Sequence, residues 1–353
     1  MDFSLSEEQR MLQETVGKFI ADRYSLDQRK GYMAQSAGHD ADVAAELAEL
    51  GLNLVQIAEE QGGLGGDAFD AMVVGEALGP GLILEPVIDV MTAVSALAGG
   101  REDILEDGNA YTLGLYERGQ RYSLTPAGTT VQGGKLTGTK TLAANSASAT
   151  HALVSALEGT EVGLYRVSLS DEGTTVFNYP LQDGRPFADL QFDGVDAEKI
   201  GGVGLAEIEA AVARMTIAEC AVAVGAMQAA LDMTKEYLSV RKQFGRPLAA
   251  FQELAFRLVD MNMEVQDARS MSFWAANQAN EASGDGLLRA ASMAKAKIGK
   301  AATYVSEDSI QLHGGMGMTL DYGIGAFAKY LVTFNLLHGD VDYHMGRAMR
   351  LSA

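Results

Sequence analysis

The sequence predicts a mixed α+β protein in three parts: an N-terminal helical domain, a central β-barrel or sandwich domain, and a C-terminal four-helix bundle. The prediction rests on the spacing of apolar residues along the chain. Apolar residues recur at helical spacing in residues 1–108, alternate in short runs in 109–203, and return to helical spacing in 204–353. With 353 residues, 47% of them hydrophobic, the chain can bury the cores of two or three domains.

The first domain is predicted to begin with a capped helix. Ser6 precedes the acidic pair Glu7 and Glu8 and a run of apolar residues at helical spacing, which is typical of a helix N-terminus. Two further helical segments are expected at 44–52 and 68–78.

The central domain is predicted from short apolar runs that alternate, as in half-buried strands. Such runs lie at 111–115, 129–131 and 162–167, and glycine pairs such as Gly133-Gly134 separate them. The final domain is predicted from longer amphipathic segments at 205–240, 250–280, 286–314 and 323–350.

Composition limits the function. A net charge of -20 argues against a nucleic-acid surface and against an anionic membrane. Arg241, Lys242 and Arg246 form a local basic group that could still hold phosphate. The single cysteine, Cys220, excludes an internal disulfide and fits a reducing compartment.

The start of the chain has no basic region before an apolar run, so we expect no signal peptide and a cytoplasmic protein. The longest apolar stretch, 217–231, contains Glu219 and Gln228. We therefore expect no membrane span.

The most specific motif follows the first long helix of the bundle and reads Arg241-Lys242-Gln243-Phe244-Gly245-Arg246-Pro247-Leu248, with Phe251-Gln252 after it. Cations in a last helical turn and a glycine–proline stop are ordinary features of a helix end. The order of arginine, glutamine and phenylalanine is less ordinary. Arginine contacts phosphate oxygens in pairs, and phenylalanine offers a flat apolar face. The segment therefore favours a dinucleotide.

This segment resembles the flavin-adenine dinucleotide segment of the acyl-CoA dehydrogenases. Three more stretches resemble that family and follow in its order: Met1-Asp2-Phe3-Ser4-Leu5-Ser6-Glu7-Glu8-Gln9-Arg10, Glu60-Gln61-Gly62-Gly63-Leu64-Gly65-Gly66, and Gln311-Leu312-His313-Gly314-Gly315-Met316-Gly317-Met318. The family's plan of helical, β and helical parts is the one predicted here. The resemblance implies FAD as cofactor.

The resemblance also implies roles for individual residues. Arg241 would contact the pyrophosphate, Gln243 and Phe244 the adenine half, and Gln252 the neighbouring edge. The adenosine of a partner subunit's flavin would be received by the Gly-rich turn, through Gln311, Gly314 and Gly315. Glycine fits there because it lets the backbone approach a ligand closely.

Two motifs of the family's β domain are altered here. Its Thr-Glu-Pro-x-x-Gly-Ser-Asp corresponds to 116–122, which retains Glu117 and Gly119. Its Lys-x-Trp-Ile-Thr-Asn corresponds to 140–145, which retains Lys140 and Asn145. An aromatic side chain and a hydroxyl that the family places beside the flavin ring are therefore missing.

The catalytic base is the largest departure. Most family members carry a glutamate where His338 stands, and others carry it where Met215 stands. Glu219 lies one helical turn beyond Met215, and an apolar setting would make it a better proton acceptor. An ion pair with an arginine is the structural alternative for Glu219. Asp340 is the second candidate base, with helix capping as its ordinary explanation.

Taken with the resemblance, these residues predict FAD-dependent α,β-dehydrogenation of an acyl-CoA. Because it lacks the usual base, the chain resembles the smaller subunits of heteromeric family members. Those assemblies act in the degradation of steroids or dicarboxylic acids. The implied partners are a second dehydrogenase chain, in a dimer or an α2β2 heterotetramer, and an electron acceptor flavoprotein. The alternatives are a non-catalytic or half-site subunit, and a flavin oxidase or monooxygenase of the same fold.

Overall fold

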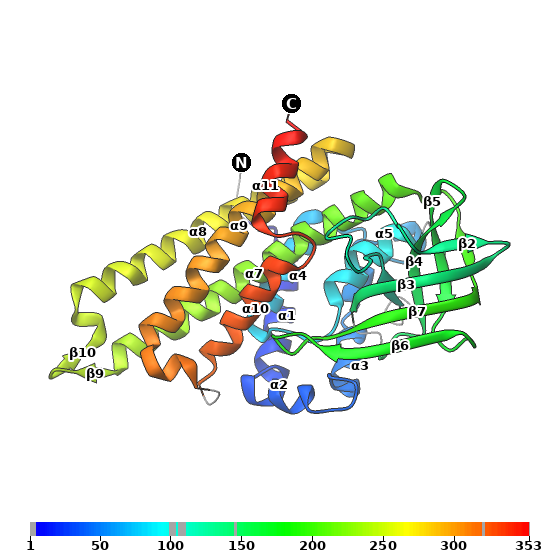
Figure 1. Cartoon of the computed structure of the whole chain (residues 1–353). Coiled ribbons are helices and arrows are strands. Elements are labelled where there is room, and N and C mark those ends of the chain that lie inside the picture. The colour runs from blue at the N-terminus through cyan, green and yellow to red at the C-terminus, as the bar shows by residue number, and fades with distance from the viewer. Residues whose placement is uncertain (1–4, 99–103, 105–110, 145–146, 320–321, 353) are drawn as a thin grey trace. The chain divides into compact units, whose positions relative to one another are not determined.

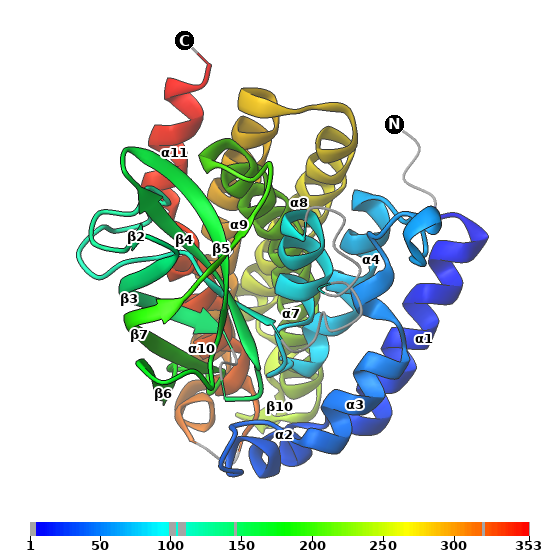
Figure 2. The same cartoon turned by 90° about the vertical axis from the view of Figure 1, so that its right-hand side faces the viewer.

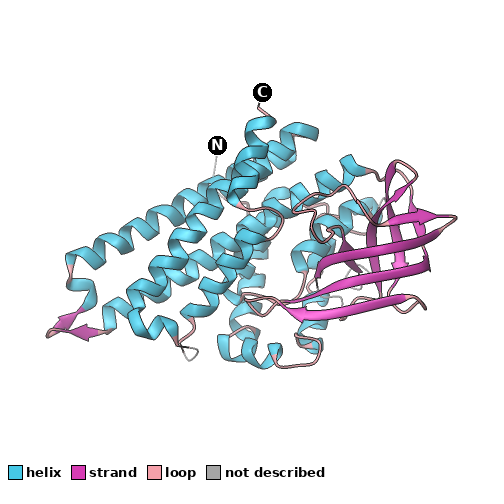
Figure 3. Ribbon diagram, in the orientation of Figure 1, coloured by secondary structure: helices cyan, strands magenta, loops and turns pink. Residues whose placement is uncertain are grey.

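The computed structural model describes residues 5–98, 104, 111–144, 147–319 and 322–352. It confirms the mixed α+β class, with helices, a central sheet and then long helices in chain order (Figures 1 and 3). By contacts the chain divides into two compact units. One holds Met1–Arg29, Met72–Ile83 and Thr216–Ala353, and the other holds Lys30–Ala71 and Leu84–Met215. The three domain ranges stay predictions, and the expected boundary at 108/109 lies outside the described residues.

The N-terminal helices form where their caps predict them. The Ser6 hydroxyl accepts the Gln9 backbone N–H, and the Gln9 side chain accepts the Ser6 backbone N–H, both at 3.1 Å. Residues Met1–Ser4, part of the opening motif, lie outside the described residues. The helices are α1 (Glu7–Arg23), α2 (Leu26–Met33), α3 (Ala41–Glu49), α4 (Ala68–Leu78) and α5 (Ser95–Leu97), with a π-helical turn at Asp89–Val94 before α5.

The central strands form one eight-stranded sheet in the order β6-β7-β3-β2-β4-β5-β8, with β1 paired to β4. Figure 2 shows β2 to β7 of this sheet. Its buried face is apolar and includes Leu136, Tyr165 and Phe192. Within the described residues no pairing joins β6 to β8, so the strands do not close into a barrel. They are β1 (Tyr111–Gly114), β2 (Thr130–Gln132), β3 (Lys135–Ala144), β4 (His151–Glu158), β5 (Glu161–Ser168), β6 (Thr174–Pro180), β7 (Pro186–Asp196) and β8 (Glu198–Ile200).

The C-terminal bundle consists of α7 (Leu205–Val240), α8 (Gln252–Glu281), α9 (Gly284–His313), α10 (Ile324–Leu336) and α11 (Val341–Arg350). The prediction of one helix over 323–350 was wrong. His338 and Gly339 have φ values of 57° and 122°, a conformation that ends a right-handed helix. The chain therefore turns a corner between α10 and α11.

α7 has the length and composition to cross a membrane: an 18-residue window has a mean hydropathy of 1.5, and 89% of that window is buried. The helix contains the longest apolar stretch of the sequence, 217–231, for which no membrane span was predicted because Glu219 and Gln228 interrupt it. Its burial is that of a core helix in a bundle.

Candidate functional site

The Arg241 segment is a short hairpin at the end of α7. Its two strands are β9 (Lys242–Gln243) and β10 (Arg246–Pro247). Phe244 and Gly245, at the tip, have φ values of 52° and 79°, the left-handed pair that a two-residue hairpin turn requires. In Figure 1 the hairpin projects at one end of the bundle. The tip therefore has the backbone of a tight turn and is open to solvent.

The hairpin side chains are exposed. Arg241, Lys242 and Gln243 are all exposed, and 91% of the Phe244 surface is accessible. Such exposure of a phenylalanine costs free energy that burial against a partner or ligand would recover. The hairpin thus offers cations and a flat apolar face together, as the motif predicts.

The base of the hairpin is an aromatic platform. The Arg246 guanidinium lies 4.1 Å from the ring centre of Phe251, and the Phe244 ring meets the edge of Phe251 at 6.1 Å. Gln252 follows as the first residue of α8. Arg246, one of the three predicted phosphate cations, therefore also stabilises the platform through a cation–π contact.

The second segment predicted to contact a nucleotide follows the end of α9. Gly314 has φ 57° and Gly315 follows it in a 3-10 turn, Gly314–Met318. Both glycines are exposed, and a Cβ built on either meets no atom within 4 Å. Gln311, in the last turn of α9, is also exposed. The positive φ explains Gly314, whereas protein packing gives no reason for a glycine at Gly315.

The structure brings the two segments to the same end of the bundle. Tyr237, in the last turn of α7, stacks on His313, the last residue of α9, with ring centres 4.5 Å apart and planes inclined by 26°. Arg241 lies one turn after Tyr237, and Gly314 directly follows His313. This contact could not be predicted from the sequence, because no local pattern pairs the end of α7 with the end of α9.

Glu219, the first candidate base, lies inside the bundle on α7 and is 8% exposed. Its neighbour Cys220 is fully buried, and burial raises the pKa of that thiol to about 12. The charges of Lys295 and Glu219 both act on the thiol, in opposite directions. A carboxylate and an ammonium therefore both act on Cys220 in the buried interior. Met215, at the family's alternative base position, is buried.

Asp340, the second candidate base, caps α11. Its carboxylate accepts the backbone N–H of Tyr343 at 2.8 Å. The structure therefore supports the ordinary explanation for this aspartate, since an N-cap carboxylate satisfies an otherwise unpaired donor.

The corner before Asp340 is held from inside the bundle. The buried His344 donates from Nε2 to the His338 carbonyl at 3.0 Å. Burial lowers the pKa of His344 to about 3, and the charges of Lys295 and Arg347 act in the same direction. His344 is therefore neutral and serves as a fixed hydrogen-bond donor to the corner.

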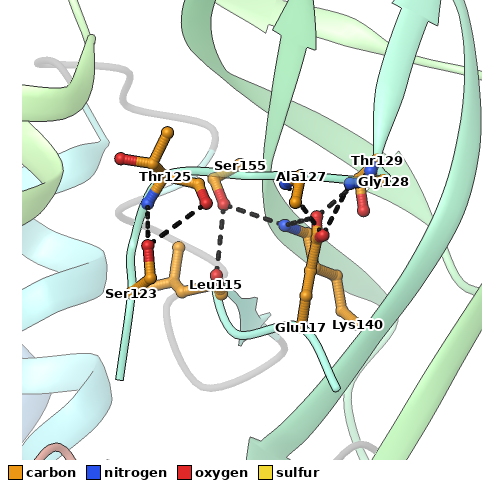
Figure 4. Close-up of polar contacts among 9 residues, drawn as sticks. All are labelled: Leu115, Glu117, Ser123, Thr125, Ala127, Gly128, Thr129, Lys140 and Ser155. Atoms are coloured by element: carbon orange, nitrogen blue, oxygen red, sulfur yellow. Dashed lines mark hydrogen bonds and ion pairs between the residues drawn. The ribbon is translucent and has the colours of Figure 1, made fainter. Parts of the chain in front are cut away.

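In the sheet, Glu117 and Lys140 meet in a buried ion pair (Figure 4). The Lys140 ammonium lies 3.0 Å from Glu117 and 3.1 Å from the Ser155 hydroxyl. The Glu117 carboxylate also accepts three backbone N–H groups, those of Ala127, Gly128 and Thr129, at 2.7–3.1 Å. Glu117 and Lys140 are two of the residues retained from the altered motifs, and each is engaged in this pair. Asn145 lies outside the described residues.

The electrostatics of this pair follow from its burial. Burial alone would raise the pKa of Glu117, but hydrogen bonding at Thr129 and the charge of Lys140 lower it to about 2. Burial lowers the pKa of Lys140 to about 8 against the opposing charge of Glu117. Both groups are therefore charged at neutral pH, as a paired buried carboxylate and ammonium should be.

No cluster of three or more potential metal ligands occurs in the part of the chain that the structure describes. The site residues are instead cations, aromatic rings, amides and glycines, which suit an organic phosphate ligand.

Known proteins match the chain along most of its length. The acyl-CoA dehydrogenase IpdE2 of Mycolicibacterium smegmatis is 24% identical over 329 residues, 92% of each chain. A solved structure of a Tcur3481–Tcur3483 steroid ACAD variant is 27% identical, with a TM-score of 0.89 over 99% of this chain and 98% of that one. The ChsE4–ChsE5 complex from Mycobacterium tuberculosis has the same fold, at 22% identity and a TM-score of 0.88 over 99% and 98%.

The family profiles agree with these relatives. The N-terminal domain of the acyl-CoA dehydrogenases matches residues 6–110, and their C-terminal domain matches residues 201–350. The chain belongs to the acyl-CoA dehydrogenase family, whose members are oxidoreductases acting on CH–CH groups.

Proposed function

We propose that this chain binds FAD and introduces an α,β double bond into an acyl-CoA thioester, as one subunit of an oligomer. The observation that carries the proposal is the convergence of the exposed hairpin and the exposed Gly-rich turn at one end of the bundle. Names of relatives that refer to steroids favour a steroid-derived acyl group over a dicarboxylic one.

The residues present fit a dinucleotide. Arg241 would hold the pyrophosphate, Gln243 and Phe244 the adenine half, and Gln252 its neighbouring edge. The open space beside Gly314 and Gly315 leaves room for an adenosine to approach the backbone. Following the family's arrangement, that adenosine and its contact with Gln311 belong to a partner subunit's flavin.

For the chemistry on this chain we propose Glu219 as the base. Its carboxylate would take the proton from the carbon next to the thioester carbonyl, in a setting where little water competes. Bound FAD supplies the acceptor for the hydride that leaves the next carbon. Asp340 is less suited, because its carboxylate already caps α11.

The second candidate is a half-site subunit that contributes nucleotide contacts while a partner chain carries the base. Two observations favour it: Met215 and His338 occupy both positions where the family keeps its glutamate, and Asp340 is used as a cap. In either case an electron acceptor flavoprotein would reoxidise the bound FAD.

The test is the absorbance of the purified chain with FAD, followed by anaerobic addition of steroid-derived and straight-chain acyl-CoAs. Bleaching of the flavin by the chain alone supports the dehydrogenase. Flavin that bleaches only when a second dehydrogenase chain is present supports the half-site subunit. Light scattering on the same sample measures the assembly, and a stable, flavin-loaded monomer would contradict the oligomer.

A further inference from the structure

Three aromatic rings are packed at the end of the bundle that carries the nucleotide segments. The His313 ring lies 4.5 Å from that of Tyr237 and 5.0 Å from that of Tyr322, and the two tyrosine rings meet edge-on at 5.6 Å. His313 is only 2% exposed. The three residues form a single packed cluster, and stacking of this kind adds to the free energy of burial.

Tyr237 and His313 each lie next to one of the two predicted nucleotide segments in the chain. The backbone carbonyl of Tyr237 accepts the N–H of Arg241 at 2.8 Å, which fixes the first residue of the hairpin segment. His313 precedes Gly314, and a Cβ built on Gly317 would lie 3.1 Å from the His313 Cβ. The Gly-rich turn therefore folds against His313, while the hairpin segment begins from Tyr237.

The orientation of the His313 ring is fixed by a hydrogen bond. Nδ1 donates to the Ser309 carbonyl at 2.7 Å, which leaves Nε2 as an acceptor. Nε2 is buried and has no hydrogen-bond partner within the described residues. Burial lowers the pKa of His313, with the Ser309 contact opposing it, so the ring is neutral. A buried acceptor without a partner costs stability.

We propose that the stack of Tyr237 on His313 is a positioning element. It would hold the hairpin, which would contact one flavin, at a fixed spacing from the Gly-rich turn, which would receive the adenosine of a partner subunit's flavin, before either dinucleotide binds. The inference rests on the proposed function, because it names how that site is preorganised. Neither residue is assigned a contact with the reacting atoms. A preorganised site binds more tightly because its ordering cost is met during folding.

The test is a double-mutant cycle on FAD affinity, measured by titrating FAD into the flavin-free form of the whole protein. Tyr237→Leu and His313→Leu fill most of the volume but cannot stack. Each single variant should weaken FAD binding roughly tenfold. The double variant should bind FAD at most about threefold more weakly than the weaker-binding single variant. His313→Phe restores a ring and should bind FAD within about threefold of the wild type.

A matched control separates positioning from general loss of stability. Val265 is fully buried in α8, thirteen residues from the start of that helix and so roughly 20 Å from the hairpin. Val265→Ala should lower the melting temperature and leave FAD affinity unchanged.

Wild-type FAD affinity in His313→Leu would overturn this inference alone, as would fully additive effects in the cycle or failure of His313→Phe to restore binding. A wild-type protein that binds no FAD would instead overturn the proposed function, and this inference with it.

Discussion

The β-sheet unit and the bundle use the same kinds of polar residue in opposite ways. In the β-sheet unit, Lys140 is buried, the Glu117 side chain is 9% exposed, and the Glu117 carboxylate has four hydrogen-bond donors. At the end of the bundle, Arg241 and Phe244 are exposed. Both regions match motifs that the family associates with flavin. The difference teaches that a motif residue indicates a binding site only when its side chain is not already hydrogen-bonded within the fold.

The largest expected effect concerns Glu219, which could serve as the catalytic base or, like Glu117, as half of a structural ion pair. If it is the base, Glu219→Gln should keep the fold and the flavin yet slow bleaching by acyl-CoA by about two to four powers of ten. If it serves as a structural ion pair, the variant should instead lose roughly 3–5 kcal/mol of stability with its activity largely kept.

Glu76→Gln is the matched control for that experiment. Glu76 also lies within the bundle unit, and it forms a 2.8 Å ion pair with Arg269. The Glu76→Gln variant should lower the melting temperature without slowing the bleaching of the flavin by acyl-CoA. A Glu219→Gln variant with normal stability and normal rate would remove Glu219 from consideration and leave the base to a partner chain.

The second prediction concerns the sheet. Glu117→Ala leaves the buried Lys140 ammonium without its partner and three backbone N–H groups without their acceptor. We expect a loss of roughly 3–5 kcal/mol in the free energy of unfolding, measured by urea denaturation. The exposed pair of Lys135 and Asp196 is the control, and Asp196→Ala should cost about 0–1 kcal/mol. Equal losses in the two variants would contradict the structural role of Glu117.

Acid should weaken the same pair. The folded pKa of Glu117, about 2, is below its ordinary value of 4.5. The stability it contributes is therefore fully present above about pH 4.5 and is lost as pH falls towards 2. Urea unfolding of the wild type and Glu117→Gln between pH 5 and 3 measures this. The difference between the two should shrink with acid, and a difference that grows would contradict the assigned pKa.

The smallest effect on stability should come from the exposed hairpin tip. Phe244→Ala should change the free energy of unfolding by no more than about 0.5 kcal/mol, because the ring is 91% accessible. FAD affinity should nevertheless fall by about fivefold, as expected when a base loses a stacking partner. Calorimetric titration with FAD measures this, and an unchanged affinity would remove Phe244 from the adenine site.

Much of this arrangement could be predicted from local sequence. The Ser6 cap, the helix at 68–78 and the helix over 205–240 all depend on neighbouring residues, and each forms as expected. The hairpin that follows Val240 was not predicted. The break in the last helix was missed because His338 adopts a left-handed conformation, which few residues other than glycine favour.

Contacts between distant segments could not be predicted. Lys140 lies 23 residues from Glu117 in the chain, and Tyr237 lies on a different helix from His313. Neither pair follows from helical or strand periodicity, because those patterns fix only neighbours within one element. The role of Glu219 could not be predicted for the same reason, because it depends on side chains from other helices that lie around this carboxylate.

The most direct test of the exposed bundle end as the flavin site is the FAD content and affinity of Arg241→Ala. Its control is Lys235→Ala, which removes an exposed positive charge earlier on α7. Loss of a charged hydrogen-bond donor should weaken FAD binding by about ten- to a hundredfold, with circular dichroism unchanged and Lys235→Ala close to wild type. Normal flavin absorbance and affinity in Arg241→Ala would contradict the assignment of this end of the bundle to FAD.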